Sequence, residues 1–174
     1  SAVDLSGGVK TIYSNNLSFA ALKEDGSVVT WGDFGEWALV QYPSSQLSSG
    51  VKAIYSNNFY SYAALKEDGS VVTWGSSFTG ADSSAVASQL SSGVKTIFST
   101  HYAFAALKDD GSVVTWGHSQ MGGDSSAVDL SGGVKTIYSN RYAFAAVKEN
   151  GSVVTWGHDD RGGDSSSVVD ELAA

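Results

Sequence analysis

The stretch DGSVVTWG, at residues 25–32, decides the fold, because the chain contains it again at residues 68–75 and 110–117 and, as NGSVVTWG, at residues 150–157. The tryptophans of the four copies are Trp31, Trp74, Trp116 and Trp156, spaced by 43, 42 and 40 residues. A second marker, the tripeptide GVK, has its valines at Val9, Val51, Val94 and Val134, spaced by 42, 43 and 40 residues. Two markers with one period predict four repeats of about 42 residues.

Each repeat predicts a β-hairpin with one further strand before it in the sequence and a weaker one after it. The Asp–Gly or Asn–Gly pair stands between two β-rich runs, FAALK and SVVTW, and this favours a two-residue type I′ turn. The run VKTIYS before them predicts a third strand, and the SSAV run that ends at Val128, with its equivalents, predicts a weaker fourth. No segment has helical periodicity over ten or more residues. We therefore expect a single repeat domain over residues 1–174, with units at about 1–42, 43–85, 86–126 and 127–174.

Both faces of the predicted sheet are apolar. Side chains alternate along a strand, so Val29 and Trp31 point one way while Val28 and Thr30 point the other, and FAAL is apolar on both sides. A short sheet that is buried on both faces and repeated every 42 residues fits a propeller blade between two neighbours. The sequence predicts an all-β fold, a β-propeller of four-stranded blades with Trp31, Trp74, Trp116 and Trp156 in its core. A solenoid is the alternative repeat architecture.

These residues carry a family resemblance over the whole chain. The pattern of VK and IYS, then AFAALK, DGSVVTWG and GGDSS resembles the bacterial form of the regulator of chromosome condensation repeat. The resemblance implies β-propellers that bind other proteins, as the family's propeller-type inhibitor of β-lactamase does. The chain departs from the family where NLSFAAL, THYAFAAL and NRYAFAAL stand before the second strand, and where MGGD or RGGD follows Trp–Gly.

Four repeats are fewer than the roughly seven blades that the resemblance implies. The connecting run SSAVDL, at residues 125–130, recurs as SAVDL at residues 1–5 and as SSSVVDEL at residues 165–172, so there are five copies of the connector for four hairpins. A homodimer could complete an eight-bladed ring, and this is the reading that we favour, because an unclosed arc exposes two apolar faces. A four-bladed ring, or an arc from a longer repeat protein, is the alternative.

Composition excludes several classes of function. The net charge of −8 disfavours contact with a phosphate backbone, so we expect no nucleic-acid partner. The chain has no cysteine, which excludes disulfides and sulfur-based zinc sites. No apolar run approaches the roughly 20 residues of a membrane helix, so we expect no membrane insertion. An extracellular or cell-surface location is favoured over the cytoplasm. The eight lysines all fall at two positions of the repeat, which indicates a role in the scaffold.

Catalytic chemistry finds little support in the sequence. His118 and His158 share one repeat position directly after Trp–Gly, but a metal site needs three or four ligands in fixed geometry. The two GGD runs resemble calcium-binding repeats without their nonapeptide period, and no serine triad, phosphate loop or dinucleotide motif is present. We predict a non-enzymatic protein without cofactor or metal.

Binding residues are expected where the repeats differ. The run DFGEWALVQYP after Trp31 places Phe34, Trp37 and Tyr42 where the other units have polar residues, and these aromatics predict either an interface or a cap on an apolar face. The loops before the second strands share one rim of the predicted ring and contribute Tyr60, His101, Tyr102, Arg141 and Tyr142. The leading hypothesis is a scaffold that presents this rim to a protein partner, alone or as a segment of a larger repeat or surface protein. The alternatives are a lectin-like module and a duplicated or designed symmetric scaffold without a ligand.

Overall fold

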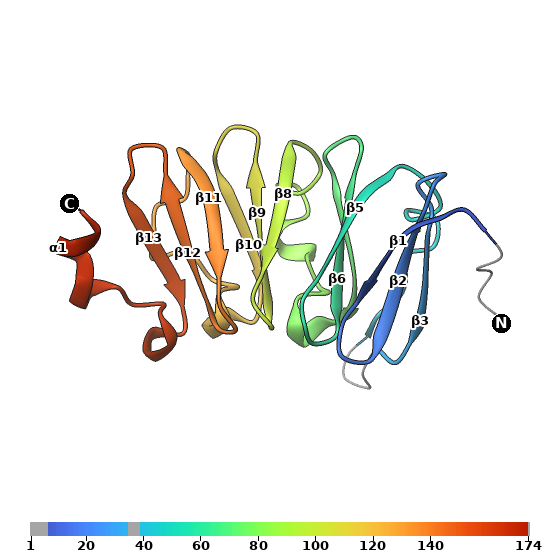
Figure 1. Ribbon diagram of the computed structural model, residues 1–174, viewed down its shortest axis with the longest axis horizontal. Coiled ribbons are helices and arrows are strands. Elements are labelled where there is room, and N and C mark those ends of the chain that lie inside the picture. Colours follow the sequence, from blue (N-terminus) through green and yellow to red (C-terminus); the bar gives the residue numbers. More distant parts are fainter. Residues whose placement is uncertain (1–6, 35–38, 174) are drawn as a thin grey trace.

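The computed structural model describes residues 7–34 and 39–173, which form four β-sheets standing side by side in one row (Figure 1). Each sheet is built on one repeat, and we call the sheets blades 1 to 4 in chain order. Blade 1 contains β1 (Val9–Ser14), β2 (Ser18–Lys23) and β3 (Val28–Gly32). Blade 2 contains β5 (Val51–Ser56), β6 (Ser61–Lys66), β7 (Val71–Ser76) and the short β4 (Leu39–Val40). Blade 3 contains β8 (Val94–Ser99), β9 (Ala103–Lys108) and β10 (Val113–Gly117). Blade 4 contains β11 (Val134–Ser139), β12 (Ala143–Lys148) and β13 (Val153–Gly157).

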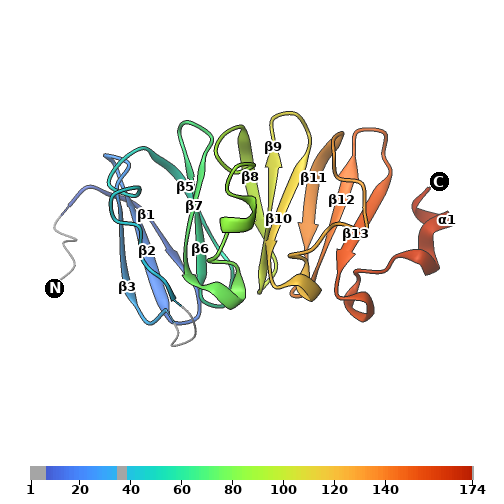
Figure 2. The same cartoon turned by 180° about the vertical axis from the view of Figure 1, so that it is seen from behind.

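Short helical turns follow the third strands of blades 2, 3 and 4, and those after blades 2 and 3 lie in the connections to the next blade (Figure 2). They are the 3-10 helices η1 (Ser77–Thr79), η2 (Ser84–Val86), η3 (Ser119–Met121), η4 (Asp159–Arg161) and η5 (Ser166–Val168), and the final α1 (Val169–Leu172). In the part of the chain that the structure describes, no helix has the length and apolar character to cross a membrane.

Every blade is an antiparallel meander with the same orientation in the row. The first strands, β1, β5, β8 and β11, contact one another in succession and form one edge of the row, while β3, β7, β10 and β13 lie on the other side of their sheets. Blades 1 and 4 lie at opposite ends of the row (Figure 1). The four blades therefore do not close into a ring by themselves.

The predicted hairpins are present, but their turns differ from the predicted type. The amide of Lys23 donates to the carbonyl of Ser27 at 2.9 Å, so the loop holds three residues rather than two. Its last residue, Gly26, has a positive φ of 76°. A carboxylate oxygen of Asp25 accepts from the amide and the hydroxyl of Ser27 at 2.9 and 2.6 Å. This side-chain bond stabilises a turn that ends in a left-handed glycine, which a three-residue hairpin favours.

The fourth strand that the SSAV runs predict is wrong in the described residues. Ser84–Val86 and Ser166–Val168 are 3-10 helices, and the equivalent run before Val128 is a turn. The physical reason is local: a carboxylate oxygen of Asp82 accepts from the amide of Ser84 at 3.0 Å, which bends the chain away from an extended path. Within the same described ranges, blades 1, 3 and 4 are three-stranded, and blade 2 gains a fourth strand where β4 pairs with β7. The connector copy at residues 1–5 lies outside the described residues.

The core lies between the blades, as the alternation of apolar residues predicts. Between blades 3 and 4, Ala105 and Leu107 of β9 pack against Phe144 of β12 and Trp156 of β13. The two other junctions use the equivalent residues. Trp74, Trp116 and Trp156 are buried, whereas Trp31 is only half-buried because blade 1 has no blade before it in this chain.

The lysines follow the backbone. In the first strand of each blade, the pairing with the second strand shifts register at one exposed lysine. These lysines are Lys10, Lys52, Lys95 and Lys135. The second set closes the hairpins, and the ammonium groups of Lys66 and Lys108 donate to the carbonyls of Gln46 and Gln89, both at 2.8 Å. Both sets therefore have positions that the scaffold dictates.

Candidate functional site

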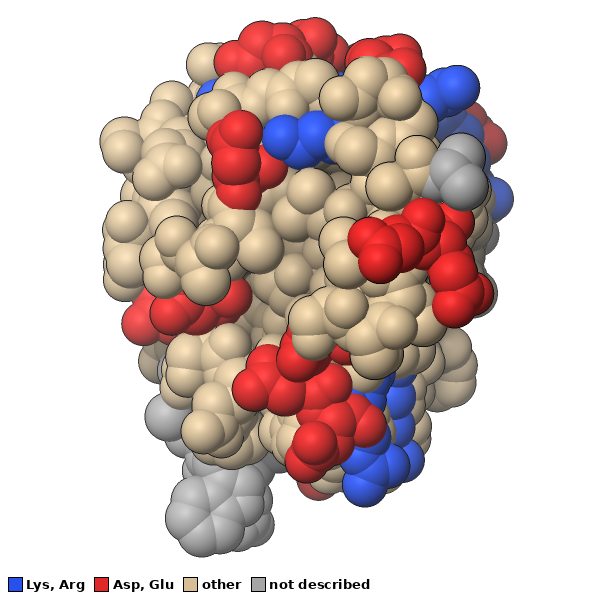
Figure 3. All heavy atoms as spheres, turned by 90° about the vertical axis from the view of Figure 1, so that its left-hand side faces the viewer, with Lys and Arg blue, Asp and Glu red and all other residues tan. Residues whose placement is uncertain are grey.

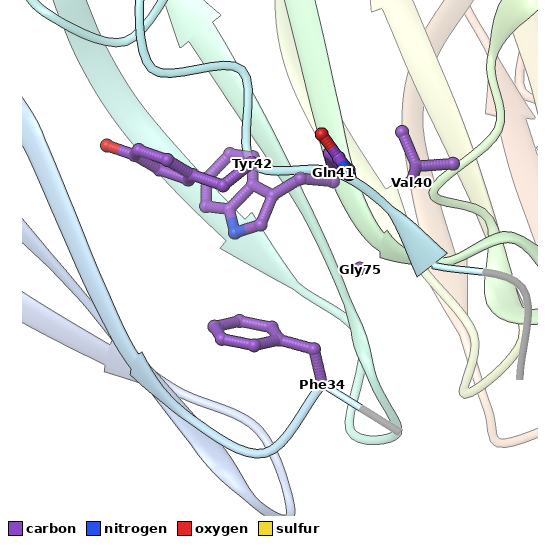
Figure 4. Close-up of a pocket in the computed structure, with 6 residues that line it drawn as sticks. Phe34, Val40, Gln41, Tyr42 and Gly75 are labelled. Carbon is purple, nitrogen blue, oxygen red and sulfur yellow. The ribbon is translucent and has the colours of Figure 1, made fainter. Parts of the chain in front are cut away.

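The segment that departs from the repeat borders a pocket of about 360 Å³ beside β7. Phe34 lies on one side of this pocket, and Val40, Gln41 and Tyr42 lie along another (Figure 4). Trp74 and Gly75 of blade 2 complete the lining. Trp37, the third aromatic predicted here, lies outside the described residues.

Phe34 and Tyr42 both pack on the core between blades 1 and 2. The ring of Phe34 meets that of Tyr62 edge-on at 6.4 Å, and the ring of Tyr42 meets Trp74 at 6.1 Å. The hydroxyl of Tyr42 donates to the carbonyl of Val28, and burial raises the pKa of this phenol. The two side chains thus act in part as the cap on an apolar face that the sequence allowed as an alternative.

Two buried donors beside this segment have no hydrogen-bond partner among the described residues. The indole nitrogens of Trp116 and Trp156 donate to the carbonyls of Gly80 and Gly122, at 2.9 and 3.2 Å. Within the described ranges, the indole nitrogen of Trp74 and the side-chain nitrogen (Nδ2) of Asn15 have no such acceptor. In the later repeats the acceptors come from the turn after the third strand, and the corresponding DFGEW run lies largely outside the described residues.

The loops between first and second strands form one rim, at the lower edge of the row in Figure 1. Each loop folds around a side-chain acceptor. The side-chain oxygen of Asn57 accepts from the amides of residues 59, 60 and 61, and that of Asn140 accepts from residues 142 and 143. The hydroxyl of Thr100 accepts from residues 102 and 103.

Rings from successive blades meet along this rim. The ring centroids of Phe59 and Tyr102 are 4.9 Å apart, and those of Tyr102 and Tyr142 are stacked at 6.1 Å. His101 contacts both Phe59 and Tyr102, and Tyr60 contacts Phe59. Four of the predicted residues, Tyr60, His101, Tyr102 and Tyr142, are therefore brought into one row across blades 2 to 4.

Two positively charged side chains lie at the blade 4 end of this row of rings. The guanidinium carbons of Arg141 and Arg161 each lie 5.4 Å from the centroid of the Tyr142 ring. These are the only arginines in a chain of net charge −8. Burial and the positive charge of Arg141 lower the pKa of His101, so its imidazole stays neutral near pH 7.

Sequence reasoning missed members of the row that come from the turns after the third strands. The rings of Phe78 and His118 are 4.9 Å apart, His118 meets Tyr102 at 6.3 Å, and His158 meets Tyr142 at 6.3 Å. The hairpin topology was the available signal, because it returns the third strand to the rim where the second strand begins. We call the aromatic rim the set Phe59, Tyr60, Phe78, His101, Tyr102, His118, Arg141, Tyr142, His158 and Arg161.

His118 and His158, considered above as metal ligands, each lie against the tyrosine of their own blade. Across the described residues, no three His, Cys, Asp or Glu side chains gather closely enough to hold a metal ion. Their environment is thus the aromatic rim.

Blades 1 and 4, at the two ends of the row of blades, each expose an apolar face. On blade 1, Ile12 is 53% and Phe19 is 44% exposed, with Phe19 stacked on Trp31 at 5.3 Å. On blade 4, Tyr138 is 63% exposed beside a hollow of about 220 Å³. Figure 3 looks onto the blade 4 end: its centre is hollowed and uncharged, and acidic side chains lie around it. Neither face is covered by the polar side chains that a solvent-exposed sheet face usually carries.

Comparison with solved structures identifies the fold as a β-propeller. Yeast RCC1 (Prp20), in a complex with Kap60, matches 87% of this chain at 17% identity with a TM-score of 0.59, and the match spans 44% of that protein. The CRINKLY WD40 ectodomain of the Arabidopsis thaliana receptor kinase ACR4 matches 86% of the chain at 17% identity with a TM-score of 0.55, over 50% of its length. The ectodomain of the Physcomitrella patens receptor kinase CR4 gives 86%, 16% and 0.54, over 39% of its length.

The chain thus spans about half the length of the propellers that it matches. No protein-family model and no curated protein matches the sequence. The solenoid alternative is excluded by the propeller fold.

Proposed function

We propose that this protein is a non-enzymatic propeller scaffold that binds a protein partner through its aromatic rim. The observation that supports this best is the distribution of differences among the repeats. Blade positions hold nearly identical residues in all four units, whereas the rim loops hold rings and arginines that differ from unit to unit. Aromatic side chains and arginine are the residues that dominate binding energy at protein interfaces.

The form of the rim suggests what the partner presents. Tyr102 and Tyr142 are half-buried and held by neighbouring rings, so they lose little conformational freedom on binding. Arg141 and Arg161 are exposed beside Tyr142 and supply positive charge. An extended peptide segment with an acidic side chain next to an aromatic one fits this combination, with the charge at the blade 4 end.

The proposal includes completion of the ring by a second chain. The open row of four blades supports an assembly in which two chains supply eight blades. The exposed apolar faces at both ends support it as well, because monomers rarely leave such sheet faces open. We also propose that the four units are repeats of the bacterial type of the regulator of chromosome condensation.

A displayed peptide library tests the rim. Peptides selected on the wild-type chain should lose at least about tenfold in affinity on Tyr142→Ser or Arg141→Ser, a loss of about 1.4 kcal/mol or more. They should keep their affinity on Glu149→Gln, which changes a turn at the opposite edge of the blades. Selected peptides that bind all three variants equally would contradict the rim as the binding surface.

A glycan array run in parallel tests the alternative that stacked rings favour, a lectin-like surface. Glycans that bind the wild-type chain and not Tyr142→Ser would replace the protein-binding proposal. Binding of neither peptides nor glycans would leave the symmetric scaffold without a ligand as the better account.

A further inference from the structure

The two open faces of the row are the two halves of one junction. Ile12 and Phe19 of blade 1 occupy the positions of Ile137 and Phe144 in blade 4, which are 2% and 1% exposed against blade 3. Tyr138 of blade 4 occupies the position of Phe98, which packs on the junction between blades 3 and 4. Each end therefore lacks the neighbour that the other end of a second chain can provide.

We propose that chains join head to tail, with blade 1 of one chain seated on blade 4 of the next. This inference rests on the ring completion proposed above and adds its direction and its contacts. The same faces meet three times within the chain, so the docking continues an interface that the fold already contains. A face-to-face pairing of two blade 1 ends would repeat no junction in the molecule.

The hollow on blade 4 has the lining that seats an aromatic ring at the internal junctions. It is lined by Ala143, Ala145 and Gly162, among others. At the junction of blades 3 and 4, a side chain on Gly122 would meet the ring of Phe144 at 2.6 Å, so the glycine leaves room for that ring. Gly162 is the equivalent glycine, and a side chain added there would meet the side-chain nitrogen (Nδ2) of Asn140, at 3.3 Å, but no ring of the described residues. Phe19 of the next chain fills this place.

Hydrogen bonds define the same register. The indole of Trp156 donates to the carbonyl of Gly122, so Trp31 of the next chain donates to the carbonyl of Gly162. The amide of Val134 donates to the carbonyl of Gly111 at 2.9 Å, so Val9 of the next chain donates to the carbonyl of Gly151. The docking thus brings two donors to specific acceptors as well as burying apolar surface.

Two exposed serines make the direction testable. At the internal junctions the first strands lie close together, and the hydroxyl of Ser56 donates to the carbonyl of Ser14 at 2.8 Å. In the proposed junction, Ser14 of one chain takes the corresponding place beside Ser139 of the other. Because the chain has no cysteine, Ser14→Cys and Ser139→Cys introduce the only thiols, and adjacent first strands lie within the reach of a disulfide.

The experiment oxidises micromolar protein and resolves it on a non-reducing gel, with the native mass measured beforehand. A mixture of the Ser14→Cys chain with the Ser139→Cys chain should form a two-chain product, and each variant alone should not. The double variant should give a two-chain product with no free thiol. Ser45→Cys, at an exposed serine away from both faces, sets the background, and circular dichroism checks that every variant is folded.

The outcomes separate the two proposals. A native mass of one chain would overturn ring completion and this inference together. A native mass of two chains, with no cross-link in the mixture or with a cross-link in the Ser14→Cys chain alone, would overturn the head-to-tail direction and leave the pairing. A ladder of higher products from the double variant would keep the docking and overturn closure at two chains.

Discussion

Inner and end blades have nearly the same sequence and very different surroundings. Phe104 is fully buried where blade 3 packs against blade 2, whereas Phe19, at the same position of blade 1, is 44% exposed. Ile97 and Ile12 differ in the same way, at 3% and 53% exposed. The comparison shows that these faces are built for burial in every repeat, and that a missing neighbour rather than a changed residue exposes them at the ends.

The largest contrast is expected between two tryptophans. Trp116→Ala should lower the free energy of unfolding by roughly 3–5 kcal/mol, because it removes a buried ring and leaves a cavity. Trp31→Ala should cost less in the separated chain, since Trp31 is half-buried there. Urea denaturation, followed by circular dichroism, measures both values.

The same pair sharpens the comparison through protein concentration. If chains pair through blade 1, the cost of Trp31→Ala should rise with concentration while that of Trp116→Ala stays constant. Equal costs for the two tryptophans at every concentration would break the distinction between inner and end blades.

A leucine pair gives the next largest effect. Leu90 is 2% exposed between blades 2 and 3, and its carbonyl accepts from the amide of Val71 at 2.9 Å, so Leu90→Ala should cost about 2–5 kcal/mol. Leu172 has the corresponding sequence position in the last connector but is 39% exposed, so Leu172→Ala should lower the thermal midpoint far less. A similar fall in both midpoints would show that Leu172 is already buried in solution.

A smaller effect is expected at the junction of blades 1 and 2. The hydroxyl of Tyr62 donates to the carbonyl of Ser18 at 2.8 Å, whereas blades 3 and 4 have phenylalanine at this position. Tyr62→Phe should therefore fit the site and lose about 1 kcal/mol with the hydrogen bond. Denaturant unfolding checks this, and a loss above about 3 kcal/mol would mean that the hydroxyl has a further role.

The smallest effect concerns the hairpin turns and pH. Bonds from the hydroxyl and then the amide of Ser70 lower the pKa of Asp68 below its usual 3.8. A group with a lowered pKa in the fold contributes stability above about pH 3.8, and this contribution is lost as the pH falls through the folded value. Asp68→Asn should remove its share of the acid destabilisation and keep the turn, because Asn150 makes the same bond to the amide of Ser152 at 3.0 Å.

Urea midpoints between about pH 5 and pH 2 measure this difference. The reverse change, Asn150→Asp, is the matched variant and should add acid sensitivity to blade 4. Identical pH profiles for wild type and both variants would contradict the role given to these bonds.

Much of the fold could be predicted because the repeat states the same local rules four times. Period, hairpins and the two apolar faces follow from DGSVVTWG and its neighbours, whose alternation is a property of extended backbone. The SSAV runs could not be assigned correctly from β-propensity, because the side chain of Asp82 or Asp164 turns the backbone before a strand can form. Tertiary pairing likewise gives β4 to blade 2, although Leu39 and Val40 follow the hairpin of blade 1.

The candidate site was predicted in part, since the loops before the second strands were identified from their variability. Phe78 and Arg161 were missed because they are distant in sequence from those loops and reach the rim only through the return of the third strand. The sequence also could not decide how far Phe34 and Tyr42 belong to the core, because an aromatic residue in a loop suits a cap as well as an interface.

The measurement that tests the central claim most directly is the mass of the native chain in solution, by light scattering over a range of dilutions. Two open faces that complete each other predict a particle of twice the chain mass of 18.1 kDa, dissociating only on dilution. A stable particle of one chain mass at every concentration would contradict the account, because both apolar faces would then be tolerated in water.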